Sequence, residues 1–394
     1  MICNLEEQKM KGNANYILYV IGSMEVGGAE QHLLNVSSRL VRQGWSCGVF
    51  ALNPNGPLRS SFERAGVPVT GVKLSPILVR TLVRPKLVSR LRLLLAIPKL
   101  AFYLWRRRPG IIHFFLPAAY VIGGATSMFA LYRPRRIMSR RSLNLYQLKY
   151  PLFRRVEHWL HSRVDIVCGN SIAVMKDLRD EGVPDKKLRL IYNGIDIQRF
   201  ESGAHKFQSR KELSIDDDAF VFIMVANFIE YKGHADLLEA LAEIESSLPS
   251  NWICLLVGRD DGIGGHLREM SVKLGIADKV RFLGARKDVP DLLNASDVGV
   301  LCSHEEGFSN AILEGMAAGL PMVVTAVGGN GEAIVHGING LVVPPQSSHE
   351  LGVALLSMTD SKLRSAMGRE SQARVKELYS LDACVKSYER MYLE

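Results

Sequence analysis

The chain has 394 residues, 47% of them hydrophobic, and contains 34 glycines. This length suits two domains, and the composition excludes disordered and fibrous proteins. The formal net charge of +9 is unevenly distributed: residues 51–150 contain a single acid, Glu63, whereas residues 201–250 contain ten acids. The two halves of the chain are therefore expected to meet different partners.

The six cysteines are scattered and show no spacing typical of a metal site. Cys168, Cys254 and Cys302 lie within apolar runs that resemble strands, where a free thiol behaves as a small hydrophobic group. This pattern favours a reducing compartment. Residues 1–13 lack the basic and then apolar pattern of a secretory signal, so we expect a cytoplasmic protein.

The first half of the chain alternates strands and helices. We expect a strand at 16–21, a glycine-containing loop, a helix that begins near Ala29 and a second strand at 45–52. A strand, a helix and a strand in this order predict a parallel sheet. Further strands are expected within 163–171 and 187–196, with a helix between them.

An uncharged run of more than 20 residues, from Gly110 to Tyr132, is long enough to span a bilayer. Pro117 and the pair Gly123–Gly124 interrupt it, however, and arginines flank both of its ends. We therefore favour a buried strand at 111–115 followed by an apolar helix over a spanning helix.

The alternation restarts at 219–227 and continues to the C-terminus. The fold class is therefore α/β, with two doubly wound domains that each contain a parallel sheet. We assign residues 1–197 to the first domain and 198–375 to the second, with a last helix, at about 376–394, packing back on the first. The expected elements of the second domain are helices at 234–246, 265–274, 288–294 and 310–318, and strands at 251–258, 280–284, 298–303, 321–325 and 341–345.

Two glutamates, Glu306 and Glu314, bracket the start of the helix at 310–318. The N-terminus of a helix attracts phosphate, and Gly307 allows a ligand to approach the backbone closely. A carboxylate one turn into the helix, Glu314, can accept hydrogen bonds from a ribose diol, and Glu306 can do the same for a sugar beyond the phosphates. Together these groups predict a nucleotide-sugar site. The alternative is a surface helix, capped by Ser309 or Asn310, with two solvated acids.

Motifs along most of the chain resemble the retaining glycosyltransferases of family 4, which have the two-domain GT-B fold with a cleft between the domains. Glu306 and Glu314 match the E-x7-E element of that family. The other matching stretches are VGGAEQHLLNVSSRL (26–40), NSIAVMKDL (170–178), IYNGIDIQRF (191–200), VANFIEYKGHADLLEAL (225–241) and most of 280–345.

The resemblance implies a role for several residues of the second domain. Glu314 corresponds to the acid that holds the donor ribose, and Glu306 to the acid that meets the donor sugar. Lys232 corresponds to the lysine that neutralises the diphosphate, where charge builds up as the glycosidic bond breaks. A solvated lysine is the alternative for Lys232. The backbone near the diphosphate and the donor sugar would be that of Phe308, Ser309 and Asn310.

Two further positions of the second domain border the expected donor site. Asn227 stands where the family commonly has an arginine beside the diphosphate, so more of the positive charge falls on Lys232. Arg286 stands where the backbone of the family contacts the nucleobase, and its side chain is expected to be solvated or donor-binding.

In the first domain, the resemblance points to a loop and to a strand. Gly27 and Gly28 precede a helix in a loop that faces the donor phosphates and borders the acceptor, although a glycine pair is also typical of a tight turn. His113 occupies the first position of an HxH-like pattern, and Phe115 occupies the second. We count His113 among the candidate catalytic residues, with a hydrogen-bonded strand histidine as the alternative.

A basic segment, residues 73–108, contains ten Lys or Arg and no acid, interleaved with leucines and with Phe102, Tyr103 and Trp105. A basic amphipathic segment with aromatic residues is typical of binding to an anionic membrane surface. A pair of helices with one solvated face is an alternative. Nucleic acid is a rival partner, but no binding motif supports it.

The function predicted from these features is the transfer of a hexose from a UDP- or GDP-sugar to a saccharide or a lipid-linked saccharide. Such an enzyme would serve cell-surface polysaccharide or glycolipid synthesis at the inner face of the plasma membrane. We expect no metal and no further cofactor, and we interpret the acidic run 216–218 as a solvated turn. Two alternatives stay open: a nucleotide-sugar epimerase of the same fold, and a non-catalytic sugar-nucleotide sensor that docks on membranes.

Overall fold

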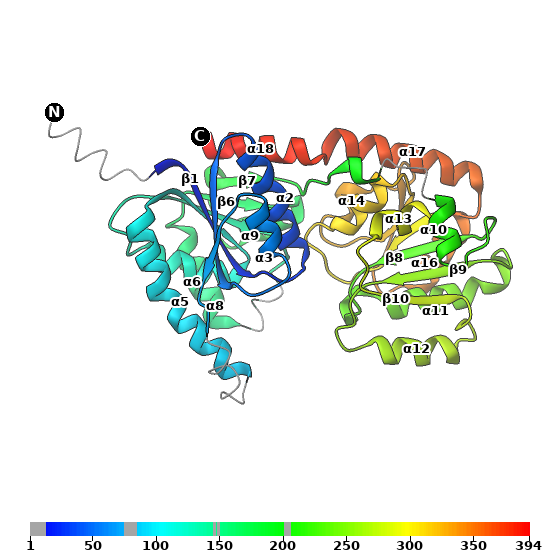
Figure 1. Ribbon diagram of the computed structural model, residues 1–394. Coiled ribbons are helices and arrows are strands. Elements are labelled where there is room, and N and C mark those ends of the chain that lie inside the picture. The colour runs from blue at the N-terminus through cyan, green and yellow to red at the C-terminus, as the bar shows by residue number, and fades with distance from the viewer. Residues whose placement is uncertain (1–12, 75–84, 145–146, 148–149, 201–205) are drawn as a thin grey trace. The chain divides into compact units, whose positions relative to one another are not determined.

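The computed structural model describes residues 13–74, 85–144, 147, 150–200 and 206–394. They form two compact units, of which the first runs to Tyr192 and includes Cys384–Glu394, and the second is Asn193–Ala383. Each unit contains a parallel sheet covered by helices on both faces (Figure 1). The predicted α/β class with two doubly wound parallel-sheet domains is confirmed.

The sheet of the first unit has seven parallel strands within the described residues, in the order β3-β2-β1-β4-β5-β6-β7. Strands β2, β4 and β6 are buried along most of their length, as expected for parallel strands covered on both faces. The strands are β1 (Asn13–Ser23), β2 (Ser46–Asn53), β3 (Val69–Gly71), β4 (Pro109–Phe115), β5 (Arg135–Arg140), β6 (Ile166–Gly169) and β7 (Leu188–Leu190).

Two sets of helices cover this sheet. The helices of the first unit are α2 (Gly28–Arg42), α3 (Arg59–Arg64), α5 (Pro85–Arg107), α6 (Pro117–Ser127), α8 (Pro151–His161), α9 (Ile172–Asp180) and α18 (Leu381–Leu393). Helices α5, α6, α8 and α9 pack on the face that carries Leu18 and Phe114. Helices α2 and α18 lie on the other face, where His113 and Tyr19 approach Tyr392 of α18.

The uncharged run from Gly110 to Tyr132 forms most of β4 and then α6, which confirms the buried strand and the apolar helix. Of the helices that the structure describes, none has both the length and the apolarity needed to cross a bilayer. Part of the basic segment, residues 75–84, lies outside the described residues, and most of the remainder forms α5.

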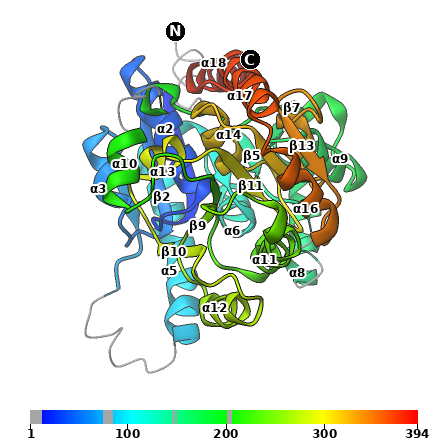
Figure 2. The same cartoon turned by 90° about the vertical axis from the view of Figure 1, so that its right-hand side faces the viewer.

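The sheet of the second unit has six parallel strands within the described residues, in the order β10-β9-β8-β11-β12-β13. The strands are β8 (Val221–Val225), β9 (Ile253–Val257), β10 (Val280–Gly284), β11 (Val298–Leu301), β12 (Met322–Thr325) and β13 (Gly340–Val343). Helices α13 and α14 lie over one face of this sheet, and α11 and α16 lie over the other (Figures 1 and 2). The helices are α10 (Lys206–Glu212), α11 (His234–Ile244), α12 (Gly264–Lys273), α13 (Val289–Asn294), α14 (Asn310–Ala317), α15 (Asn330–Ala333), α16 (Ser348–Ser357) and α17 (Ser361–Leu378).

The boundaries between the units differ from the expected ones by a few residues. The chain enters the second unit at Asn193 instead of 198, because the Ile195 N–H donates to the Tyr379 carbonyl at 2.9 Å and the Ile195 carbonyl accepts from the Leu381 N–H at 2.8 Å. The chain returns to the first unit at Cys384 instead of 376, because α17 packs against α14 in the second unit.

Candidate active site

The order in which successive strands are added to the second sheet reverses between β8 and β11. These strands are neighbours, although β9 and β10 separate them in the chain and lie on the far side of β8. The loops at their carboxyl ends therefore lead to helices on opposite faces of the sheet. Ligands of doubly wound sheets bind at such a crevice, where the N-termini of the following helices point. Here those helices are α11 and α14.

The loops after β8 and β11 are in direct contact. The His304 N–H donates to the Tyr231 carbonyl at 2.7 Å, and the His304 ring lies 2.8 Å from the Asp236 carboxylate. Gly233 has a φ of +74°, and a Cβ at this position would lie 2.1 Å from the Cys302 carbonyl oxygen. Only glycine therefore fits between the two loops without moving them apart.

Lys232 and Glu306 form an ion pair across these loops. Glu306 also accepts a hydrogen bond of 3.0 Å from the Ser303 hydroxyl. The two side chains are only 17% and 12% exposed, respectively, so the pair is largely shielded from water. An ammonium group has three donors and a carboxylate has about four acceptor sites, so both groups keep capacity for a ligand.

A third loop, after β12, supports the backbone around Glu306. Gly328 has a φ of +50°, and a Cβ there would lie 1.7 Å from the Glu306 carbonyl oxygen. The Gly329 N–H donates to the Gly307 carbonyl at 2.9 Å, and the Thr325 hydroxyl donates to the Ser303 carbonyl at 2.5 Å. These contacts were not predicted from the sequence, although the glycine pair at 328–329 is a visible signal of close backbone approach.

The residues that lead into α14 are held in place by a side chain from the start of the second unit. The Asn193 amide group donates to the Phe308 carbonyl at 3.0 Å and to the Asn310 side-chain oxygen at 2.6 Å. The Phe308 ring is buried 5.3 Å from the Tyr379 ring. Ser309 is the N-cap residue, but its side chain accepts no hydrogen bond from the first turn of this described helix. The hydroxyl therefore leaves the first-turn N–H groups to other acceptors.

Glu314 lies one turn into α14 and is partly exposed. Burial of its carboxyl group raises the pKa to about 7, although the positive charge of Arg199 acts in the opposite direction. At neutral pH this group is therefore divided between its neutral and ionised forms, and a hydrogen-bonding ligand can shift the balance.

Asn227 and Arg286 lie just beyond β8 and β10. The Asn227 side-chain oxygen accepts a hydrogen bond of 3.2 Å from the backbone N–H of Arg259. This contact joins the loops after β8 and β9. The Arg286 Nε donates to Asp288 at 2.8 Å, and its guanidinium group is about one-third exposed. Its side chain is thus held by a neighbour on the same loop.

Gly27 and Gly28 belong to the first unit, at the start of α2. Gly27 is the N-cap, and a Cβ there would lie 2.5 Å from the Glu30 carboxylate. Glu30 is buried, and burial raises its pKa, although a hydrogen bond from the Ser23 hydroxyl acts in the opposite direction. Glu30 was not among the residues predicted from the sequence; its signal there is an acid at the third helical position after a glycine N-cap.

The assignment of His113 as a catalytic residue does not fit its position in the first unit. His113 has no exposed surface, and its two ring nitrogens lie 2.7 Å from the Tyr392 and Ser139 hydroxyls. Burial lowers its pKa well below the ordinary range, and the positive charge of Arg141 adds to this effect. His113 is a hydrogen-bonded core residue beneath α18, with no ring atom free to contact a substrate.

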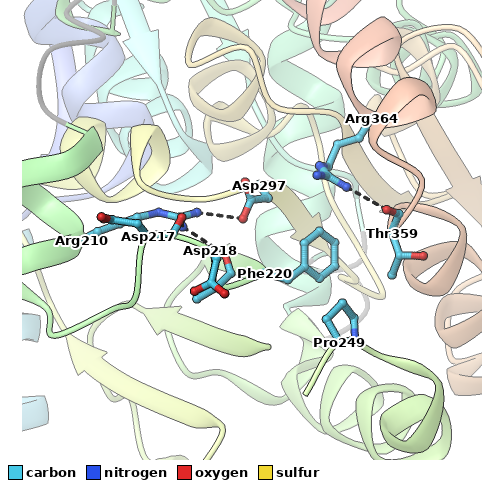
Figure 3. Close-up of a pocket in the computed structure, with 9 residues that line it drawn as sticks. Arg210, Asp217, Asp218, Phe220, Pro249, Asp297, Thr359 and Arg364 are labelled. Carbon is cyan, nitrogen blue, oxygen red and sulfur yellow. Dashed lines mark hydrogen bonds and ion pairs between the residues drawn. The ribbon is translucent and has the colours of Figure 1, made fainter. Parts of the chain in front are cut away.

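A polar cavity of about 320 Å³ lies at the opposite, amino edge of the second sheet (Figure 3). Arg210 donates to Asp297 at 2.9 Å, and Arg364 donates to the Thr359 carbonyl and covers the Phe220 ring at 5.0 Å. Both arginines are thus engaged by the protein. The acidic run 216–218 forms an exposed turn beside this cavity, far along the strands from Lys232, which confirms its interpretation as a solvated turn.

Comparisons with known proteins cover both units. Residues 26–199 match the family model described as Glycosyltransferase Family 4, and residues 205–374 match the model described as Glycosyl transferases group 1. The N-acetyl-alpha-D-glucosaminyl L-malate synthase of Bacillus anthracis is 30% identical over 233 residues, which are 58% of this chain and 60% of that protein.

Two further proteins are similar to this chain. The UDP-Gal:alpha-D-GlcNAc-diphosphoundecaprenol alpha-1,3-galactosyltransferase of Escherichia coli is 26% identical over 214 residues, which are 54% of this chain and 55% of that protein. Both of these curated relatives are thus matched over less than two thirds of their length. The crystal structure of Anabaena HepE in complex with UDP-glucose has the same fold, with a TM-score of 0.81 and 23% identity over 96% of this chain and 100% of that one. The two units of the present chain match glycosyltransferase family models in turn. The chain is therefore a glycosyltransferase of the family 4 type with the GT-B fold.

Proposed function

We propose that this protein is a retaining glycosyltransferase that moves a hexose from a nucleoside diphosphate sugar to an acceptor hydroxyl. One observation carries the proposal: the Lys232–Glu306 pair lies at the switch point of the second sheet, directly before α14. The cation and the helix N-terminus suit a negatively charged diphosphate, and the carboxylate suits the hydroxyl groups of a sugar.

Each part of the donor has a matching group. The diphosphate lies at the N-terminus of α14, over the backbone of Ser309 and Asn310, with Lys232 as its cation. Glu306 accepts hydrogen bonds from the sugar hydroxyls. Glu314 accepts hydrogen bonds from the ribose diol, and together the two acids form the E-x7-E motif. Anabaena HepE, which shares the fold, was crystallised with UDP-glucose, and this supports a nucleotide-sugar donor.

The reaction replaces the bond between the anomeric carbon and the diphosphate by a bond to the acceptor oxygen, with release of the nucleoside diphosphate and a proton. Negative charge builds on the departing diphosphate, so Lys232 and the helix N-terminus stabilise the transition state more than the bound donor. No metal ion enters this proposal, because these groups supply the positive charge.

The proposed acceptor is a saccharide or a lipid-linked saccharide in cell-surface polysaccharide or glycolipid synthesis. The E. coli relative acts on a sugar carried by diphosphoundecaprenol, which supports this class. Helix α5 exposes Leu94, Phe102 and Trp105 among its basic residues. An amphipathic basic helix of this kind binds anionic lipid, so the enzyme would work at the inner face of the plasma membrane.

A nucleotide-sugar screen followed by a turnover assay tests the function. A donor present at about a hundred times its Kd should stabilise the protein by roughly 2.7 kcal/mol, which a thermal shift detects among UDP- and GDP-sugars. The selected donor should then be consumed slowly with water and faster with a saccharide acceptor. Binding without any consumption of the donor would identify a sensor instead, and release of a free epimerised sugar would identify an epimerase.

A further inference from the structure

The loop between α6 and β5 places apolar side chains in solvent. Phe129 and Leu131 are 82% and 77% exposed. They lie at the amino edge of the first sheet, because β5 begins at Arg135. The Gly27 loop follows the carboxyl end of β1, so it lies at the other edge of this parallel sheet. Large exposed apolar residues that are close in the chain are typical of an interaction surface.

A cavity of about 550 Å³ lies behind this loop. Three arginines and a single carboxylate line it, so its charge is positive. The lining residues are Met128, Ala130, Tyr132, Arg133, Pro134, Arg135, Arg136 and Asp165.

The arginines of the cavity keep donors for a ligand. Arg136 donates to the Ser127 hydroxyl and carbonyl at 3.1 and 2.8 Å, and Arg135 donates through one nitrogen to the Tyr392 carbonyl at 3.1 Å. Arg133 is exposed and makes no hydrogen bond or ion pair within the described part of the chain. A guanidinium group presents five donors in a planar fork that fits phosphate oxygens.

The one carboxylate does not neutralise these guanidinium groups directly. Asp165 accepts a hydrogen bond of 2.7 Å from the backbone N–H of Arg136, and its own N–H donates to the Arg136 carbonyl at 2.9 Å. This pair of backbone contacts fixes Asp165 at the edge of β5. The cavity therefore keeps a net positive charge.

Tyr132 supplies an independent sign of a ligand. Its side chain is only 4% exposed, and its hydroxyl has no hydrogen-bond partner among the described residues. Burying a hydroxyl without a partner is unfavourable. Burial raises the pKa of Tyr132, although the charges of Arg136 and Arg108 act in the opposite direction, so the hydroxyl stays protonated and can donate.

We propose that this cavity binds the phosphate of an anionic phospholipid headgroup while Phe129 and Leu131 insert into the bilayer interface. The apolar loop favours a lipid over a soluble phosphate compound, because a soluble ligand gains nothing from exposed apolar side chains. The sequence contains no Asp or Glu between Arg64 and Val156, so the surrounding chain adds no acid that would repel such a surface. The proposal rests on the proposed membrane docking of the first unit and adds a defined headgroup site.

Flotation of the full chain with vesicles tests the proposal. The protein should bind vesicles that contain phosphatidylglycerol and not vesicles of phosphatidylcholine alone. Arg133→Gln should weaken binding about fivefold, the effect of one basic residue near an anionic surface. The matched control is Arg42→Gln, which removes the same charge from an exposed position of α2, on the other face of the sheet, and should change binding little.

Tyr132→Phe separates a ligand-binding role from a structural one. Loss of an unpartnered hydroxyl should leave the melting temperature unchanged or raise it, whereas vesicle binding should fall severalfold. Phe129→Ser should also weaken vesicle binding. Because this side chain is exposed, the substitution should leave the folded protein intact. Nucleotide binding by the second unit should stay unchanged in all of these variants.

The outcomes distinguish this site from the wider proposals. No binding of the wild-type protein to phosphatidylglycerol vesicles at low salt would refute both membrane docking and the headgroup site. If Arg133→Gln and Tyr132→Phe bind vesicles as well as Arg42→Gln does, the headgroup site is refuted, whereas membrane docking is not. If inorganic phosphate stabilises the wild-type protein but not Arg133→Gln, and vesicles do not bind, the ligand is a soluble phosphate compound and the lipid assignment is wrong.

Discussion

The ammonium group of Lys232 is paired with the carboxylate of Glu306, and this contact joins residues 74 positions apart in the chain. Each charge offsets the cost of shielding the other from water. In the proposed reaction the two groups act on adjacent parts of the donor, Lys232 on the diphosphate and Glu306 on the sugar. The ion pair thus fixes both groups near their proposed positions before the donor binds.

Lys232→Ala should lower turnover by about a hundredfold or more, by analogy with the loss of one donor from an oxyanion site. The reason is that Lys232 meets charge that develops only as the glycosidic bond breaks. Single-turnover kinetics with the donor identified by the screen would measure the effect. Lys273→Ala, which removes an exposed lysine from the end of α12, should leave the rate unchanged.

The same variant leaves Glu306 shielded without its partner, so part of its effect will be structural. Lys232→Ala should therefore destabilise the protein, and adding Glu306→Ala should restore stability without restoring turnover. Urea unfolding of both single variants and of the double variant gives the coupling. If the double variant recovers turnover together with stability, neither side chain acts on the donor, and the assignments of Lys232 to the diphosphate and of Glu306 to the sugar are both wrong.

Gly233→Ala should reduce turnover as well as stability, because a Cβ at this position meets the Cys302 carbonyl and pushes the two loops apart. Gly275 provides a matched control, since its φ is +79° but a Cβ added there would have no atom within 4 Å. Gly275→Ala should cost about 1–2 kcal/mol for the left-handed backbone alone, and leave turnover unchanged. Equal losses of stability and equal turnover in the two variants would contradict the loop contact.

Local patterns in the sequence predicted the strands and helices well, because buried apolar runs alternate with glycine and polar loops. The placement of Glu306 before α14 and of Glu314 within it is also local, so the sequence could indicate it. The Lys232–Glu306 contact could not be derived, since it depends on β11 lying beside β8. The burial of His113 beneath α18 could not be derived for a similar reason: its partner Tyr392 lies 279 residues away in the chain.

Glu314→Gln should stabilise the protein at pH 8 and do so much less near pH 5. The folded protein holds the pKa of Glu314 at about 7, above the ordinary value of about 4.3 in an unfolded chain. A raised acid pKa means that stability falls as the pH rises from about 4.3 to about 7, because the unfolded chain ionises over this range while the folded protein keeps its proton. Glutamine cannot ionise and escapes this loss.

The gain should be on the order of 1–2 kcal/mol, since partial exposure of Glu314 reduces the full effect of the shift. Melting temperatures of the variant and of the wild-type protein at the two pH values would measure it. Glu269→Gln, an exposed position on α12, should show no such difference between pH 5 and pH 8. A stabilisation by Glu314→Gln that is equal at both pH values would contradict the raised pKa.

The affinity for the nucleoside diphosphate should also depend on pH through Glu314. An ionised carboxylate accepts hydrogen bonds from both hydroxyls of a ribose diol, whereas the protonated form loses part of this capacity. With a pKa of about 7, roughly one Glu314 in ten is ionised at pH 6, so affinity should rise between pH 6 and pH 8, by at most about tenfold. The diphosphate gains charge over the same range, and Glu314→Gln supplies the reference curve for that effect. Calorimetric titrations of both proteins should therefore diverge above pH 7, with the wild-type protein binding more tightly; parallel curves would remove Glu314 from the ribose site.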